Sequence, residues 1–210
     1  MNIDDRPEAR RENAKTARKR RTHEAILGSA TTLVRERGIK ASSVADVMRG
    51  AGLTVGGFYA HFPSKEALFV ESIHGAARET WERFLATLPD GTARERARAV
   101  VRGYLSRVHR DSPASGCPLP AVAAEAAREG EPYRSALAEA IGRVVDELAA
   151  LLAPAPDARE RALGLLSIMY GALSLARAVG GTALSDELLL AARAAGDRQL
   201  PASESEEIRR

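Results

Sequence analysis

The side chains able to support metal or acid–base chemistry are few and scattered in this sequence. It has four histidines, His23, His61, His74 and His109, and a single cysteine, Cys117. No two histidines have the His-Glu-x-x-His spacing of a zinc hydrolase, and one cysteine cannot build a cysteine-rich zinc site. We therefore expect no metal and no other cofactor.

Two short patterns come close to known site motifs but are incomplete. Glu71-Ser72-Ile73-His74 matches the Glu-x-x-His element of di-iron helical bundles, which requires a second copy and two further Glu-bearing helices. The sequence has no second copy. Gly50-Ala51-Gly52 lacks the third glycine and the preceding strand of a dinucleotide site. The sequence therefore predicts that the chain is not an enzyme.

Cys117 allows two interpretations. It follows Gly116 at the start of an expected helix, where thiol pKa values are lowered, so it could sense oxidants or electrophiles. Without a second cysteine, such a switch needs modification of the thiol or a bond between subunits. Cys117 could equally be a small packing residue that lines a pocket.

Several features bear on the compartment. A single cysteine excludes an intramolecular disulfide and fits a reducing environment. The charged N-terminus lacks the apolar segment of a signal peptide. The longest uncharged stretch, residues 162–176, is shorter than the roughly 18–20 residues that cross a bilayer. We expect a cytoplasmic protein without membrane spans.

Charge is unevenly distributed along the chain. Residues 1–70 contain 13 basic and 8 acidic side chains, whereas the remaining residues contain 18 basic and 20 acidic ones. A cationic first third suggests a polyanionic partner for that part alone. The same charges are also compatible with a solvated basic tail.

The elements that must position these residues are predicted to be helices. Ala, Leu, Arg and Glu are abundant, and no segment alternates with the period of a strand. Residues 1–20 show no apolar period and are expected to form a disordered basic arm. The polar tail, residues 199–210, is also expected to be disordered. About nine helices are expected, near residues 22–37, 44–51, 54–61, 65–88, 93–108, 118–129, 137–153, 158–179 and 186–195.

Capping residues mark the starts of these helices. Ser42 or Ser43 can cap the second, Ser64 the fourth, and Thr92 with Glu95 forms a capping box before the fifth. By the same rules, Asp157 and Ser185 are expected to cap the last two helices.

Two of the short helices have the arrangement of a helix-turn-helix. Val44–Gly50 would be the supporting helix, Ala51-Gly52-Leu53 the turn, and Thr54–His61 the recognition helix. Gly52 can adopt a positive φ, and Leu53 is expected to fill the seam between the helices.

The recognition helix has one apolar face and two unusual glycines. Phe58 and Phe62 are four residues apart and should enter the core, which turns Tyr59 and His61 toward phosphates. Each interior glycine of Gly56-Gly57 costs a helix about 1 kcal/mol. This cost is understandable if a DNA groove edge approaches the backbone, although a frayed loop is the alternative.

These residues carry a family resemblance. The segment AGLTVGGFYAHFPSKEAL (51–68) and the upstream HEAILGSATTLVRERG (23–38) resemble the DNA-binding domain of the tetracycline-repressor (TetR) family. The specific match covers about residues 22–70, and the C-terminal half is only weakly similar. The resemblance implies an all-α protein: a three-helix DNA-binding domain at 21–70, its fourth helix continuing to about 88, and an effector-binding and dimerisation domain at 89–198.

The resemblance also implies a homodimer that places its recognition helices in successive major grooves of a palindromic operator. By position, it assigns Thr54, Val55 and Gly57 to base edges or adjoining backbone, and Tyr59, His61 and Lys65 to phosphates. Thr22 and Ser43 fall at expected helix starts that commonly touch the DNA backbone.

The base-reading capacity of the recognition helix is small. Thr54 can hydrogen-bond a base edge and Val55 can contact a thymine methyl, but no Arg, Asn or Gln offers bidentate readout. Specificity could therefore depend on DNA shape, on Arg49, or on Arg18–Arg21 of the basic arm entering a minor groove. These arginines could equally be solvated.

The C-terminal half is expected to bind an unknown apolar or amphipathic effector and to dimerise through its last two helices, where Gly164 and Gly171 form a stripe of small residues. The candidate pocket residues are Trp81, Phe84, Tyr104, Cys117, Tyr133, Met169 and Tyr170. Both sets are also compatible with ordinary core packing.

Taken together, these features predict a ligand-responsive transcriptional repressor that is released from double-stranded DNA by its effector. Two alternatives remain open at this point. One is a dimeric DNA-binding regulator without a ligand, and the other is an electrophile or redox sensor acting through Cys117.

Overall fold

The computed structural model describes residues 6–201, and within this range it contains helices and no strand. The predicted all-α fold class is therefore confirmed. The elements are α1 (Arg6–Arg37), α2 (Val44–Gly50), the 3₁₀ helix η2 (Val55–Ala60), α3 (Lys65–Ala86), α4 (Ala93–Tyr104), α5 (Arg107–Asp111), the 3₁₀ helix η3 (Pro113–Ser115), α6 (Leu119–Glu129), α7 (Tyr133–Leu152), α8 (Ala158–Ala178) and α9 (Ala183–Asp197).

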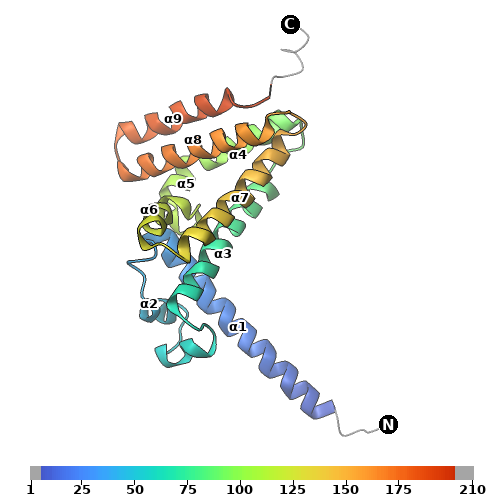
Figure 1. Cartoon of the computed structure of the whole chain (residues 1–210), viewed down its shortest axis with the longest axis vertical. Coiled ribbons are helices and arrows are strands. Elements are labelled where there is room, and N and C mark those ends of the chain that lie inside the picture. Colours follow the sequence, from blue (N-terminus) through green and yellow to red (C-terminus); the bar gives the residue numbers. More distant parts are fainter. Residues whose placement is uncertain (1–5, 202–210) are drawn as a thin grey trace, which may run out of the picture.

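The helices form a small headpiece on a larger helical body (Figure 1). The headpiece consists of α2 and η2 packed against α1 and the beginning of α3. In the body, α3 packs along α7, and α8 and α9 form an antiparallel pair at the end farthest from the headpiece. The first half of α1 projects from the body as a single long helix (Figure 1).

The length of α1 differs from the sequence prediction. Residues 1–20 were expected to be a disordered arm, but α1 begins at Arg6, and residues 1–5 lie outside the described part. The segment has no apolar face, yet it is rich in Arg, Lys, Glu and Ala, which are strong helix formers. Extending an existing helix also avoids the cost of nucleation.

The predicted helix over 93–108 is divided in two. α4 ends at Tyr104, and α5 begins after Ser106, whose hydroxyl accepts a hydrogen bond from the His109 amide. Both Nε and Nη2 of Arg193 donate to the Leu105 carbonyl, at 3.1 and 2.7 Å. A side chain from α9 therefore satisfies a carbonyl that the helix leaves free.

Two predicted caps are wrong. Thr182 caps α9, whereas Ser185 is buried and donates to the Ala176 carbonyl at 2.7 Å. Asp157 makes no capping hydrogen bond, because its carboxylate instead accepts from Arg161 at 2.7 Å.

The prediction of a disordered tail from residue 199 is also wrong at its start. Leu200 is buried in the core, and its carbonyl accepts a hydrogen bond from Arg94. Residues 202–210 lie outside the described part.

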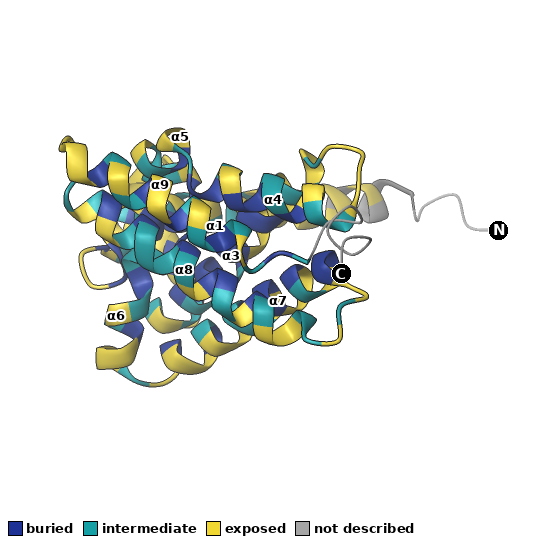
Figure 2. Ribbon diagram, turned by 90° about the horizontal axis from the view of Figure 1, so that it is seen from above, coloured by how far each residue is buried: buried dark blue, intermediate teal, exposed yellow. Residues whose placement is uncertain are grey.

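Buried apolar side chains form two clusters. One joins α1, α2, η2 and the beginning of α3 to α6 and α7, and the other fills the body between α3, α4, α7, α8 and α9. Buried and exposed residues alternate around α7 and α9 (Figure 2). No helix in the described range is both long enough and apolar enough to cross a membrane.

The headpiece and body are also joined by one carboxylate. Oε2 of Glu125, on α6, accepts hydrogen bonds from the backbone amides of Ile39 and Lys40 at 2.5 and 3.4 Å. These amides follow the C-terminus of α1, where Gly38 adopts a φ of +79°. The end of α1 is therefore held directly by the body.

Candidate nucleic-acid interface

The supporting helix α2 is fixed by its first residue. Of the two candidate caps, Ser43 is the one used: its hydroxyl accepts from the Asp46 amide at 3.1 Å, and the Asp46 carboxylate accepts from the Ser43 amide. Ser42 is buried and donates to the Gly38 carbonyl at 2.7 Å. The capping box gives α2 a defined start despite its seven residues.

The turn after α2 depends on a left-handed glycine. Gly52 has a φ of +70°, a conformation that favours glycine, and the amide of the following Leu53 donates to the Met48 carbonyl at 2.8 Å. Leu53 was expected to fill the seam between the two helices, but its side chain is 37% exposed. Because the chain turns so tightly here, Leu53 points outward.

The recognition segment is a 3₁₀ helix rather than the predicted α-helix. It spans Val55–Ala60 and contains Gly56 and Gly57, whose low helix propensity disfavours regular α-helix. The predicted burial of Phe58 and Phe62 is confirmed, and their rings stack with centroids 5.9 Å apart. These two side chains hold the segment against the headpiece core.

The opposite face of this segment is open. Val55 is 49% exposed and Tyr59 is 74% exposed. A Cβ built on Gly56 would meet no atom within 4 Å, and one on Gly57 would meet only the terminal methyl of Met48, at 3.8 Å. Nothing within the described chain requires glycine at Gly56, so the bare backbone is available to an external partner.

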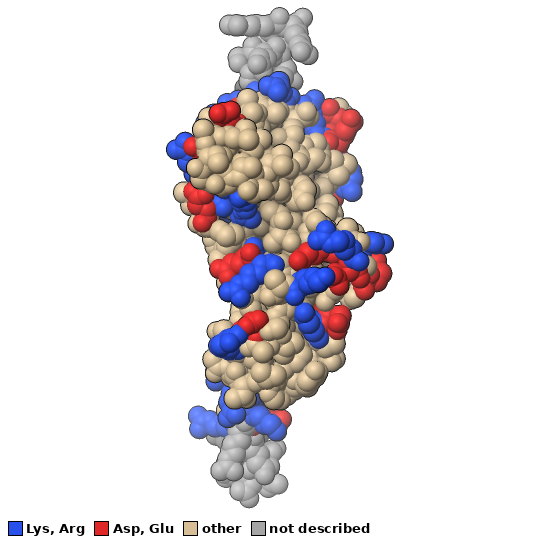
Figure 3. Space-filling view, turned by 90° about the vertical axis from the view of Figure 1, so that its left-hand side faces the viewer, with Lys and Arg blue, Asp and Glu red and all other residues tan. Residues whose placement is uncertain are grey.

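A basic hollow lies between this segment and α1. It has a volume of about 1030 Å³, and its lining includes Lys15, Arg18, Lys19 and Thr22 together with His61. The four residues of α1 have i, i+3, i+4, i+7 spacing and therefore share one helix face. Figure 3 shows mostly Lys and Arg side chains at the lower end of the described part of the molecule, below the headpiece, whereas both signs of charge are mixed across the middle of that face.

Beside this hollow, the His23 side chain connects α1 to the residues between η2 and α3, and to α3 itself. The His23 ring stacks on Phe62 at a centroid distance of 4.3 Å, and its Nε2 lies 3.1 Å from the Glu71 carboxylate. Burial, followed by the nearby His23 and Lys19, lowers the pKa of His61. In the free protein the neutral form of His61 is therefore favoured, and a neighbouring phosphate would act in the opposite direction.

The remaining predicted contacts occupy different settings. Thr22 does not lie at a helix start, as was expected: it is within α1, and its hydroxyl donates to the Arg18 carbonyl at 3.0 Å. Lys65 is the first residue of α3, and its ammonium lies 5.4 Å from the Phe69 ring centroid. Arg49 pairs with Asp46. Lys15 was missed by the sequence reasoning, although its spacing from Arg18 and Lys19 could have revealed it.

Comparisons with known proteins cover both parts of the molecule. Residues 26–71 match the domain family "Bacterial regulatory proteins, tetR family", and residues 93–192 match "Tetracyclin repressor-like, C-terminal domain". The chain belongs to the tetR family of bacterial regulatory proteins.

Individual relatives of this tetR-family chain are also transcriptional regulators by name. An uncharacterized HTH-type transcriptional regulator of Mycobacterium tuberculosis is 30% identical over 167 residues, which cover 73% of this chain and 83% of the relative. The HTH-type transcriptional repressor KstR2 of Rhodococcus jostii is 33% identical over 66 residues, which cover 31% of this chain and only 32% of KstR2.

Solved structures share the fold. The reduced form of NemR from E. coli matches with a TM-score of 0.74 at 23% identity, over 88% of this chain and 98% of NemR. A TetR regulator from Chloroflexus aurantiacus matches with a TM-score of 0.73 at 24% identity, over 87% and 95% of the two chains. These structures agree in fold, and the two domain-family matches show that the protein is a transcriptional regulator of a family that consists of regulators rather than enzymes.

The candidate effector residues of this tetR-family regulator lie mostly together. Trp81, Tyr104, Cys117 and Met169 are buried in the body, and Phe84 and Tyr170 pack against them. Tyr133 is separate, because it belongs to the cluster beneath the headpiece.

The polar groups of this cluster are buried and form few hydrogen bonds. Nε1 of Trp81 is buried and has no hydrogen-bond partner among the described residues, and the buried hydroxyl of Tyr104 has only the Cys117 thiol as a polar neighbour. Burial raises the pKa of the Cys117 thiol, which is opposite to the lowering expected at a helix start. The resting thiol is therefore not activated.

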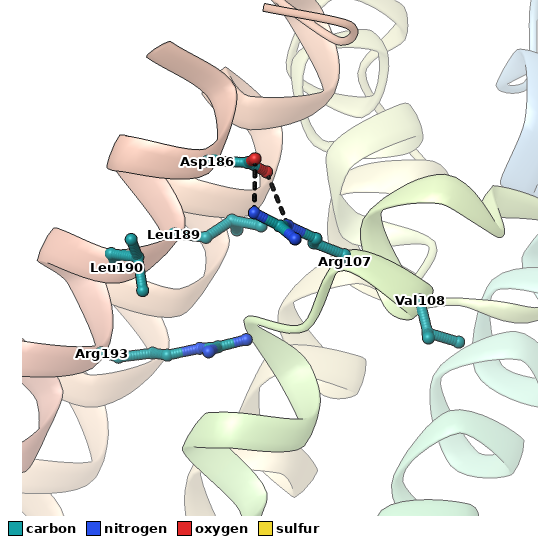
Figure 4. Close-up of a pocket in the computed structure, with 6 residues that line it drawn as sticks. All are labelled: Arg107, Val108, Asp186, Leu189, Leu190 and Arg193. Carbon is teal, nitrogen blue, oxygen red and sulfur yellow. Dashed lines mark hydrogen bonds and ion pairs between the residues drawn. The ribbon is translucent and has the colours of Figure 1, made fainter. Parts of the chain in front are cut away.

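A hollow on the body surface lies between α5 and α9 (Figure 4). It has a volume of about 400 Å³ and is lined by Arg107, Val108, Asp186, Leu189, Leu190 and Arg193. Arg107 forms a two-pronged ion pair with Asp186, at 3.0 and 2.7 Å, and Arg193 is bound to the Leu105 carbonyl. Since these polar groups are already hydrogen-bonded within the protein, the hollow presents mainly the apolar side chains of Val108 and Leu190.

Proposed function

We propose that this regulator binds a palindromic operator as a homodimer, represses transcription by occluding the promoter, and is released by a small-molecule effector. The proposal rests above all on the open backbone at Gly56 and Gly57 beside the basic hollow. Duplex DNA supplies what this surface lacks: a groove wall against the glycines, and phosphates against the cations.

The individual contacts divide into two kinds. The hydroxyl of Thr54 makes no capping hydrogen bond, and both Thr54 and Val55 are exposed, which supports their proposed contacts with base edges. Tyr59, His61, Lys65 and the α1 cations are the phosphate contacts. Ser43 contributes less, because its hydroxyl already donates to Asp46 at 2.6 Å.

Support for a homodimer comes from the outer faces of α8 and α9. Leu163, Leu175, Leu184 and Leu190 are 47%, 56%, 52% and 59% exposed. A Cβ on Gly171 would meet no atom within 4 Å, so a partner helix can approach closely there. Packing two such helix pairs would bury these leucines in a four-helix interface.

The experiment is a selection of duplexes from a random 30-base-pair pool, followed by sedimentation of the free and DNA-bound protein. We expect an inverted-repeat motif, two chains per duplex, and affinity that falls steeply with salt. A well-folded protein that enriches no motif, or binds as a monomer to a single half-site, would contradict the proposal.

A further inference from the structure

A second cleft lies where the headpiece meets the body, and it has no role in the DNA surface. It has a volume of about 470 Å³ and is bordered by the end of α1, the segment 110–113, the beginning of α6 and the end of α8. Its polar walls include Arg35, Arg110 and Arg177, and Glu36 and Asp111 complete the charged lining.

Two of the three arginines are already neutralised. The Arg35 guanidinium is bound to the Glu79 carboxylate at 2.9 Å. Arg110 is bound to Asp111 at 2.6 and 3.0 Å and to Asp186 at 2.8 Å. The charges of Arg35 and Arg110 are therefore already balanced by carboxylates of the folded protein.

Arg177 is different. Its Nε and Nη2 donate only to the backbone carbonyls of Arg110 and His109, at 3.2 and 2.9 Å, and it makes no ion pair with an acidic side chain in the described range. Burial lowers the pKa of this guanidinium. A desolvated cation without a counter-charge is costly, and an external anion would relieve that cost.

A second polar group in the cleft wall is incompletely satisfied. Arg35 is only 5% exposed, and its buried Nε has no hydrogen-bond partner among the described residues. This N–H donor lies beneath the cleft surface, so a ligand reaches it only if the Arg35 side chain shifts, and the anion site rests mainly on Arg177.

The rest of the lining limits the kind of anion. Pro113, Pro120, Ala121 and Ala178 provide a compact apolar surface. The Glu36 carboxylate disfavours a second negative charge on the ligand, whereas that of Asp111 is already bound by Arg110. We propose that this cleft binds a small monocarboxylic acid, with the carboxylate on Arg177 and the apolar body against the prolines and alanines.

The position of the cleft explains how such a ligand would act on the headpiece. Glu36 lies two residues before Gly38, and Ala121 is on the same helix as Glu125, which holds the end of α1. A ligand between α1, α6 and α8 therefore bears on the junction that orients the recognition segment. Only this regulatory consequence rests on the function proposed above.

The test measures binding to the full chain without DNA, by thermal shift and calorimetry. The probes are butyrate, hexanoate, benzoate and cinnamate, each paired with its primary amide. We expect at least one acid to raise Tm saturably at millimolar concentration and its amide to have no effect. Arg177→Gln should weaken binding at least tenfold, and Arg177→Lys should retain part of it.

Two further variants separate the cleft from general effects. Arg193→Gln also removes an arginine that serves a backbone carbonyl, but outside the cleft, and should leave binding unchanged. Ala178→Trp should block the cleft while keeping Arg177. If no acid binds, or if Arg177→Gln and Ala178→Trp both bind normally, the inference is wrong.

Two other outcomes remain distinguishable. If Arg177→Gln instead shifts the monomer–dimer equilibrium, Arg177 is neutralised by a partner subunit and the cleft assignment is overturned. If an acid binds in the cleft but leaves affinity for the selected duplex unchanged, the site stands and its proposed effector role fails.

Discussion

Basic side chains line two hollows of this molecule, and they are bound differently in each. In the hollow between α1 and η2, Lys15, Arg18 and Lys19 make no ion pair among the described residues. In the hollow between α5 and α9, Arg107 is held by Asp186 and Arg193 by a backbone carbonyl. Substitutions in the first hollow should therefore impair DNA binding without destabilising the fold. Substitutions in the body should lower stability without affecting DNA binding.

The largest effect is expected from Gly56→Leu. The side chain would extend into open space in the free protein but into the groove wall in the complex. We expect affinity for the selected duplex to fall about 100-fold, equivalent to about 2.7 kcal/mol, with Tm unchanged. Gly142→Leu on α7, where a Cβ is also unobstructed, is the matched control. Equal loss in both variants would contradict the comparison.

Replacing Lys15, Arg18 and Lys19 together by Gln should weaken binding about 30-fold at moderate salt. Because the proposed homodimer carries each substitution twice, six phosphate contacts would be lost if each side chain contacts one phosphate. The slope of log K against log salt would then become shallower by about 5.4, since each contact contributes about 0.9. The control is Arg20→Gln with Arg21→Gln, because Arg20 pairs with Glu24 instead of lining the hollow. An unchanged slope in the triple variant would exclude these phosphate contacts.

The converse test is His109, which is buried in the body. Burial lowers its pKa to about 4, from 6.5, so the folded protein resists protonation that the unfolded chain accepts. Its contribution to stability is present above pH 6.5 and is lost as pH falls toward 4. We expect His109→Gln to reduce the fall in unfolding free energy between pH 7 and 4.5 by about 1–2 kcal/mol.

DNA affinity at pH 7 should be the same for the His109→Gln variant and the wild type. If His109→Gln lowered DNA affinity as much as it changed the free energy of unfolding, the body and the DNA-binding hollow would not be independent.

The smallest effect is expected from Thr54→Ala. Losing one hydroxyl contact should cost about 1 kcal/mol and relax selection at one base pair in each half-site. Repeating the duplex selection measures this directly. An identical motif from the variant would remove Thr54 from base recognition.

The sequence predicted the headpiece well because its determinants are local. Phe58 and Phe62 lie four residues apart, Gly52 requires a left-handed turn, and Ser64 caps α3 through the Ala67 amide at 3.1 Å. Each of these can be recognised within a few residues. The 3₁₀ form of η2 was not predicted, because a segment of six residues is too short for its apolar spacing to distinguish 3.0 from 3.6 residues per turn.

The body was predicted less accurately because its determinants are distant in sequence. Thr182 and Ser185 are both competent caps, and only the Ala176 carbonyl decides that Ser185 turns inward. The break after Tyr104 involves Arg193, which is 88 residues from Leu105. The charge on Arg177 likewise becomes unusual only once folding has removed it from water.

The carboxylate of Glu125 has a mechanical consequence. It accepts hydrogen bonds from two successive amides just past the last turn of α1, which couples the end of α1 to α6, so we expect the two to move together. In the proposed homodimer, the two reading elements must match the repeat of B-DNA, about 34 Å per turn. A slight rotation of α6 in each subunit would therefore change the spacing of the two recognition segments, so that they no longer match successive major grooves of the operator.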